Sequence, residues 1–106
     1  MTDLTPTELQ AALAGDPDIQ LVDVREPWEV AIAAIPGAIV LPLGHLRELA
    51  PDALDPDRPV VAYCHHGVRS ASARRQLVDL GWDDAQHLAG GIDAWAREID
   101  PDMARY

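Results

Sequence analysis

The sequence predicts an α/β domain with a parallel β-sheet covered by helices on both faces. Short apolar runs rich in β-branched residues alternate along the chain with segments of helical pattern. Such alternation requires crossover helices between parallel strands, and these helices pack on the sheet. The chain has 106 residues, of which 48% are hydrophobic and 25% charged, so we expect one folded domain over residues 1–106 and no disorder.

The first expected elements are a helix, a buried strand and a second helix. Residues 5–8, Thr-Pro-Thr-Glu, form a capping box with proline at the first helical position, and the helix ends at Gly15 with Leu4 in its apolar stripe. The apolar run at 19–24 predicts a buried strand, and residues 26–33 predict a helix.

The remaining elements continue the alternation. The pattern predicts strands at 39–41, 59–63 and 85–88 and helices at 43–50, 68–80 and 92–99. Pro51 is expected to end the helix before it, and Gly81 to cap the next one. In the helix at 68–80 we expect four inward side chains: Ala71, Leu77, Val78 and Leu80.

The charge balance excludes several classes of partner. The net charge is −10, with eight arginines, no lysine and 18 acidic residues, so nucleic acid and anionic membranes would be repelled. A small anion can still bind in a local cradle of backbone dipoles. No apolar run is long enough to cross a membrane, residues 1–4 have no signal-peptide features, and one cysteine cannot form an internal disulfide. We therefore expect a cytoplasmic protein.

Cys64 is the candidate nucleophile. It stands where the apolar run 60–63 gives way to the polar loop 65–70. A strand that ends in Cys-x-x-Gly-x-Arg-Ser and enters a helix surrounds the sulfur with backbone N–H groups and the positive end of the helix, which favours the thiolate. The alternative is an inert buried residue, the usual role of a free cysteine. The two histidines, glycine and arginine that follow favour chemistry. Asp23 and Cys64 both lie near the carboxyl ends of strands, where such sheets bind ligands.

Four blocks of the sequence resemble the rhodanese family of sulfurtransferases. They occur in the family's order and spacing: Asp23-Val24-Arg25-Glu26, Ile35-Pro36-Gly37-Ala38, Cys64-His65-His66-Gly67-Val68-Arg69-Ser70, and Leu88-Ala89-Gly90-Gly91-Ile92-Asp93-Ala94-Trp95. The resemblance covers residues 4–98 and implies a five-stranded parallel sheet flanked by helices. The tail at 99–106 resembles the ends of rhodanese domains fused to adenylating enzymes. One departure is Ala33-Ala34, where family members commonly have Gly-His; we interpret it as a change in packing or hydrogen bonding.

The resemblance implies an enzyme of the thiosulfate sulfurtransferase type. Cys64 would carry a sulfane sulfur, as a persulfide, from a small anionic donor such as thiosulfate to a thiol, a protein or cyanide. The loop's chemistry agrees, because its backbone N–H groups can bind an anion. The candidate substrate-binding residues are His65, His66, Gly67, Val68, Arg69 and Ser70. No organic cofactor is expected.

Two roles remain open for Arg69. It either binds the sulfonate of the donor or pairs with Asp23 or Glu26 to hold the loop. Asp23 and Arg25 are expected to support the site as an ion pair.

The histidines are expected to bind no metal. His65 and His66 are adjacent, so their side chains should diverge, and zinc sites usually take ligands from separated pairs. His45 and His87 belong to no motif and are expected at the surface.

Three alternative functions remain. A persulfide relay would deliver sulfur to a partner in cofactor synthesis or tRNA thiolation. A cysteine phosphatase or arsenate reductase would also place cysteine and arginine around an anion, but that signature has five intervening residues, whereas four separate Cys64 from Arg69. A non-catalytic rhodanese-like binding module would typically lack the cysteine.

Overall fold

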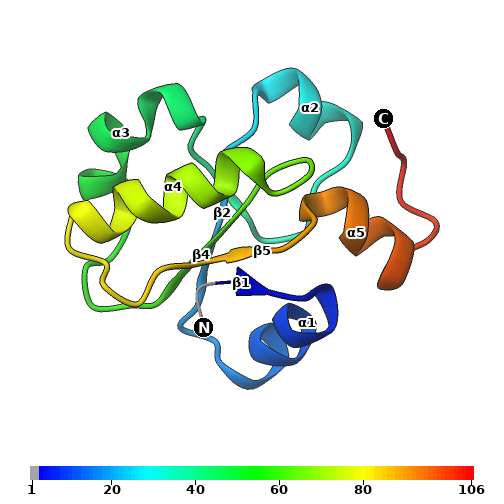
Figure 1. Ribbon diagram of the computed structural model, residues 1–106, viewed down its shortest axis with the longest axis horizontal. Helices are drawn as coiled ribbons and strands as arrows, with labels where there is room; N and C mark the ends of the chain where they lie inside the picture. The colour runs from blue at the N-terminus through cyan, green and yellow to red at the C-terminus, as the bar shows by residue number, and fades with distance from the viewer. Residues whose placement is uncertain (1–2) are drawn as a thin grey trace.

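The computed structural model describes residues 3–106 and contains the expected parallel sheet with helices on both faces (Figure 1). Five strands lie in the order β1-β5-β4-β2-β3, and every pair is parallel. Met1 and Thr2, the first residues of the expected 1–106 domain, lie outside the described residues. The strands are β1 (Asp3–Leu4), β2 (Gln20–Asp23), β3 (Ile39–Val40), β4 (Val60–Tyr63) and β5 (Gln86–Leu88). The helices are α1 (Pro6–Gly15), α2 (Pro27–Ile32), the 3-10 turn η1 (Leu43–His45), α3 (Leu46–Ala53), α4 (Val68–Asp79) and α5 (Gly91–Glu98).

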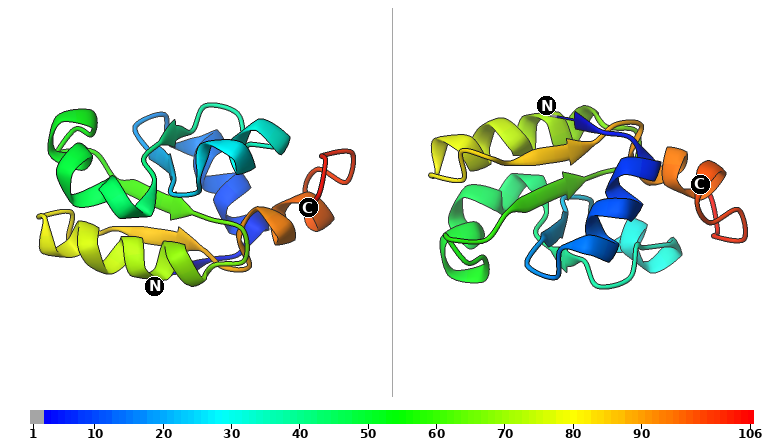
Figure 2. Two further views of the ribbon diagram at one scale, coloured as in Figure 1. Left: turned by 90° about the horizontal axis from the view of Figure 1, so that it is seen from above. Right: turned by 90° about the horizontal axis from the view of Figure 1, so that it is seen from below.

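Two apolar cores separate the sheet from its helices. Figure 1 shows α1 below the sheet and α3 and α4 above it, and Figure 2 shows the same layers from above and below. On β4, Ala62 faces the core under α3 and α4, while Val61 and Tyr63 face the core under α1 and α5. All four residues of β2 and of β4 are buried, as expected for central strands covered on both faces.

The structure corrects two of the expected boundaries. Leu4 belongs to the edge strand β1, which pairs with β5, and not to the stripe of the first helix. The helix expected at 43–50 begins as η1 and continues as α3 through Pro51 to Ala53. Proline removes only its own N–H donor, and the bond from Leu54 N–H to the Ala50 carbonyl, at 3.0 Å, closes the helix beyond it.

The buried face of α4 also differs from the expected one. Leu77 is buried as expected, but the other buried residues are Ser70 and Ala73. Val78 and Leu80 are partly buried and pack against the core, as expected. The difference matters for the site, because it places the Ser70 hydroxyl inside the molecule.

The carboxyl ends of β2 and β4 meet at one edge of the sheet. Asp23 and Tyr63 are register partners there, and Val24 N–H donates to the Tyr63 carbonyl at 3.0 Å. The next residue along, Cys64, therefore lies at this edge of the sheet. In the part of the chain that the structure describes, no helix is long and apolar enough to cross a membrane.

Candidate active site

The sulfur of Cys64 accepts hydrogen bonds from the backbone of its own loop. The Gly67 N–H lies 3.1 Å from Sγ and the Ser70 N–H lies 3.3 Å from it. Gly67 is the residue before α4 and has φ +105°, a left-handed conformation that favours glycine. The Ser70 amide belongs to the first turn of α4, where N–H groups have no partner inside the helix. The loop and the helix end thus direct two N–H dipoles at one sulfur atom.

These contacts distinguish Cys64 from a cysteine that is simply packed in an apolar core. Cys64 is only 1% exposed and contributes to the core under α3 and α4. An inert cysteine needs only apolar neighbours, whereas this sulfur has two amide donors and the Ser70 Oγ, which lies 3.6 Å away and accepts from the thiol. The geometry is that of a site that stabilises a negatively charged sulfur.

The other side of the loop is held by α5. Ile92 N–H donates to the carbonyl of Cys64 at 2.8 Å, and Asp93 N–H donates to that of His65 at 3.1 Å. Both carbonyls point away from the sulfur cradle and toward the start of α5. Gly91 has φ +61°, and a Cβ on it would overlap the backbone of Cys64 and His65. The absence of a side chain at Gly91 therefore lets the start of α5 approach the backbone of Cys64 and His65 closely.

Arg69 pairs with Glu29 of α2. Its Nη1 and Nη2 atoms lie 2.7 Å and 2.8 Å from the two carboxylate oxygens. The expected pairing with Asp23 or Glu26 was therefore wrong, although the residue does tie the loop to its surroundings. Glu29 sits three residues after Glu26, in the capping box of α2, and its side chain is only 4% exposed. The hydrogen bonds from Arg69 lower the pKa of this carboxyl to about 2.

Asp23 and Arg25 form a fully buried ion pair beneath the loop. Arg25 Nε and Nη2 donate to the two carboxylate oxygens of Asp23 at 2.9 Å and 2.7 Å. The Tyr63 hydroxyl donates to Asp23 at 2.7 Å, and Arg25 Nη2 also donates to the Ala33 carbonyl at 2.7 Å. Ala33, one of the two residues that depart from the family pattern, thus contributes its backbone carbonyl as an acceptor to this network.

Tyr106 also reaches the site, and no motif in the sequence predicts this. Its ring stacks on that of His65, with centroids 3.8 Å apart and planes at 9°. Its hydroxyl donates to Glu29 at 2.9 Å and accepts from Arg25 Nη1 at 2.9 Å. Trp28, 63% exposed, packs edge-on against the same ring. No local pattern signals these contacts, because the two hydroxyl partners lie 77 and 81 residues away along the chain.

The structure brings together the two adjacent histidines that were expected to diverge. The rings of His65 and His66 lie 3.9 Å apart and tilted by 33°, and their ligand atoms and a carboxylate oxygen of Asp93 fall within 4.8 Å of one another. Ring nitrogens bind a metal in the plane of the ring, so the closeness of these atoms does not by itself make a metal site. Asp93 is also paired with Arg105 at 2.9 Å. That no metal binds here stays a prediction.

The remaining candidate residues from the sequence differ in how far their side chains are exposed to solvent. Val68 is 81% exposed and His66 is exposed, so neither side chain is part of the buried cradle. Burial, followed by repulsion from His66, lowers the pKa of His65. His45 is exposed as expected, but His87 is half-buried and lies 3.0 Å from the Ser70 hydroxyl, so its expected surface placement was wrong.

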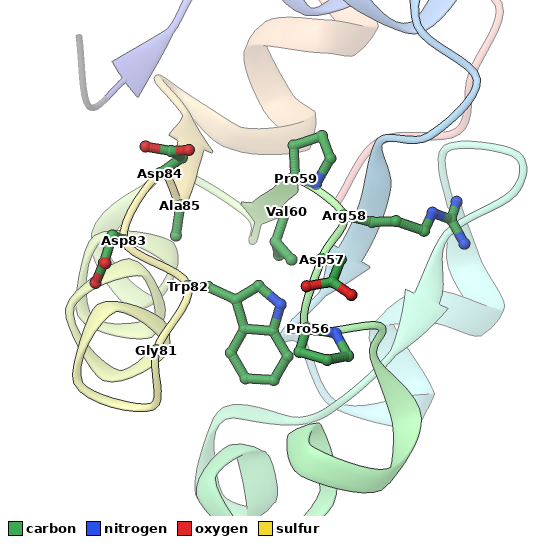
Figure 3. Close-up of a pocket in the computed structure, with 10 residues that line it drawn as sticks. All are labelled: Pro56, Asp57, Arg58, Pro59, Val60, Gly81, Trp82, Asp83, Asp84 and Ala85. Carbon is green, nitrogen blue, oxygen red and sulfur yellow. The ribbon is translucent and has the colours of Figure 1, made fainter.

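A surface pocket lies at the opposite edge of the sheet (Figure 3). It has a volume of about 330 Å³ and is lined by Val60 at the start of β4, Ala85 before β5 and the ring of Trp82 beside Pro56. Ligands of open parallel sheets bind at the carboxyl ends, so this pocket is separate from the Cys64 site.

The fold is thus an open parallel sheet of the α/β class that presents a cysteine, in a loop of backbone N–H donors, at its carboxyl edge. Residues 5–98 match the model of the rhodanese-like domain. A sulfurtransferase from Allochromatium vinosum is 38% identical over 104 residues, which cover 98% of this chain and 96% of that protein. The structure of the human single-domain sulfurtransferase TSTD1 superimposes with a TM-score of 0.82 at 26% identity, covering 92% of this chain and 97% of that one.

The likeness extends to larger proteins. The probable adenylyltransferase/sulfurtransferase MoeZ of Mycobacterium tuberculosis is 42% identical over 106 residues, covering 97% of this chain. The chain spans only 26% of that protein's length. The chain therefore belongs to the rhodanese family.

Proposed function

We propose that this protein transfers a sulfane sulfur from a thiosulfate-like donor to a thiol or cyanide acceptor through a persulfide on Cys64. The observation that carries the proposal is the pair of N–H donors, from Gly67 and Ser70, at 3.1 Å and 3.3 Å from the sulfur. They favour the thiolate over the thiol, and the thiolate is the nucleophile.

The reaction has two halves. In the first, the thiolate attacks the terminal sulfur of the donor; the new S–S bond forms as the bond to the sulfonate sulfur breaks, and sulfite leaves with that electron pair. In the second, the acceptor attacks the outer sulfur of the persulfide, and Cys64 leaves as the thiolate. Each half begins or ends with negative charge on Sγ, so the same amide donors serve both. Neither half needs a metal or an organic cofactor.

The loop fits a sulfur atom better than a phosphoryl group. Four residues separate Cys64 from Arg69, one fewer than in the phosphatase signature, so fewer amides surround the anion. The Arg69 guanidinium also presents two nitrogens to Glu29, whereas a phosphatase needs the arginine fork for the phosphoryl oxygens.

A second candidate is a relay that hands the persulfide to a partner protein. The observation that favours it is exposed apolar surface at the loop: Val68 is 81% exposed and Trp28 63% exposed. Apolar side chains at the mouth of a site are suited to contact with a protein acceptor. A relay would turn over poorly with cyanide and much faster with its partner.

Mass spectrometry of the intact protein tests the carrier step directly. After incubation with thiosulfate we expect a mass gain of one sulfur atom in the wild type and none in Cys64→Ser, which removes the nucleophile and keeps nearly the same volume. Circular dichroism of the variant controls for folding. A folded Cys64→Ser protein that still transfers sulfur from thiosulfate to cyanide would contradict the mechanism.

A further inference from the structure

A chain of three polar side chains links the nucleophile to strand β5. The Cys64 thiol donates to Ser70 Oγ at 3.6 Å, and Ser70 Oγ lies 3.0 Å from Nδ1 of His87. Ser70 is fully buried in the first turn of α4, and His87 is half-buried on β5. Ser70 belongs to the cysteine motif, but nothing in that motif indicates a histidine on another strand. The two side chains meet because α4 lies against β5 in the folded protein.

The Ser70 hydroxyl can switch its hydrogen between two acceptors. Its oxygen also lies 3.2 Å from the Gly67 carbonyl, so its one hydrogen goes either to that carbonyl or to His87. When it goes to His87, the serine lone pairs are free to accept the thiol proton. When it goes elsewhere, the His87 Nδ1–H can donate to the serine. A proton relay needs the serine both to donate to His87 and to accept from it. Both arrangements are possible without movement of the oxygen or nitrogen atoms.

The surroundings of His87 keep the resting imidazole neutral. Burial lowers its pKa most, and the charges of Arg74 and Arg75 on α4 lower it further, whereas Asp3 on the neighbouring strand β1 raises it. Its register partner on β4, Ala62, has no charge. A neutral imidazole can accept a proton, which a permanently charged group could not do.

We propose that Ser70 and His87 form a proton relay for Cys64, with His87 as the proton store; this rests on the proposed function, in which the thiolate attacks. The Sγ–H bond breaks and its proton goes to Ser70 Oγ, while the serine hydroxyl proton goes to Nδ1 of His87. The electron pair stays on sulfur, so the products are a thiolate and an imidazolium. When the protonated thiol re-forms, the proton returns by the same path. Ser70 contacts the reacting sulfur, and His87 is a positioning residue that acts through it.

The test measures the alkylation of Cys64 by iodoacetamide across about pH 5 to 9, a range that spans the ordinary values of a free imidazole and a free thiol. The key variant is His87→Asn, because the amide nitrogen of asparagine sits near the place of Nδ1 and can still hydrogen-bond to Ser70 but cannot accept a proton. We expect its alkylation rate near neutral pH to fall about tenfold and its acid limb to move to higher pH, since a relay of this kind supplies general-base assistance. The matched control is His45→Asn, an exposed histidine on η1, which should stay within about twofold of wild type.

Double variants separate a relay from a simple contact. Ser70→Ala interrupts the same path, so adding His87→Asn to it should slow alkylation no further. Additive losses, or a His87→Asn profile that matches the wild type in rate and in shape, would overturn the proposal.

A second measurement needs no change at His87. The relay couples the two titrations, because a thiolate stabilises the imidazolium. By NMR, His87 should therefore have a higher pKa in the wild type than in Cys64→Ser, and equal values would overturn the proposal. Neither readout uses a sulfur donor. A wild type that shows the relay but gains no sulfur from thiosulfate would contradict only the proposed function.

Discussion

Arg69 and Glu29 face each other as two forks, with both guanidinium-to-oxygen distances below 3 Å. The pair joins the first turn of α4 to α2, 40 residues earlier in the chain. The arginine that closes the cysteine loop is thus anchored by a neighbouring helix, and its charge is balanced before any substrate arrives.

The first prediction concerns stability in acid. The pKa of Glu29 is about 2 in the folded protein and near 4.5 when unfolded, so the unfolded chain binds more protons between these values. Its stabilisation is complete above about pH 4.5 and is lost as the pH falls toward 2. We expect Glu29→Gln to lower the free energy of unfolding near neutral pH by about 3 kcal/mol at most and to flatten the acid slope.

Urea unfolding at a series of pH values measures this slope. The control is Glu48→Gln, since Glu48 is exposed and has only a long contact with His45, 4.0 Å, so its stability profile should hardly change. A Glu29→Gln protein with the wild-type slope would show that the ion pair is not what acid breaks.

The second prediction separates the ring of Tyr106 from its hydroxyl. Tyr106→Phe removes the bonds to Glu29 and Arg25, which should cost about 1 kcal/mol of stability, and keeps the stack on His65. Tyr106→Ala removes the stack as well, so His65 becomes more exposed and its pKa should rise toward the usual value. NMR titration of His65 distinguishes the two variants. An equal rise in Phe and Ala would mean that the hydroxyl, not the ring, shields His65.

The third prediction tests the close approach at Gly91. Gly91→Ala places a Cβ on the carbonyls of Cys64 and His65, so we expect displacement of the loop and a loss of sulfur transfer of about a hundredfold. Gly37→Ala is the matched control, because Gly37 also has positive φ, +86°, but no atom within 4 Å of the added Cβ. Both variants carry the strain of a left-handed residue, of about 1 kcal/mol, so only the clash differs. Equal transfer rates in the two variants would disprove the steric argument.

The fourth prediction concerns the length of the loop. Inserting one glycine between Gly67 and Val68 moves the Ser70 amide away from Sγ, and a shift of about 1 Å can cost a hundredfold in rate. Thiosulfate-dependent transfer should fall accordingly, and the unmodified protein should not hydrolyse an aryl phosphate. If the unmodified protein hydrolysed an aryl phosphate at a rate comparable to its sulfur transfer, the loop-length argument would be wrong and the phosphatase alternative would be favoured.

The periodicity of the sequence predicted the layers of the fold, because strands and helices leave local patterns. The two-residue strand β1 is too short to leave one. The expectation for Pro51 was wrong, because α3 continues through this proline and closes beyond it with the bond from Leu54 N–H to the Ala50 carbonyl.

In the site too, the local motif could be predicted from the sequence and the long-range contacts could not. Cys64 and its loop form one contiguous motif and were predicted from it. Glu29, His87 and Tyr106 reach the loop from other elements, through side-chain bonds that span 17 to 81 residues. Contacts of that range depend on the folded sheet, and no local pattern encodes them.

The two hydrogen bonds that α5 gives to the Cys64 loop have a consequence for the newly made chain. Synthesis delivers the thiol at residue 64, but the amides that brace its loop only at residues 92 and 93. At ordinary rates of translation this interval is on the order of seconds. Until α5 has folded against the loop, the chain holds a nucleophile without these two braces, so Cys64 is more accessible to oxidants before folding ends than in the folded protein.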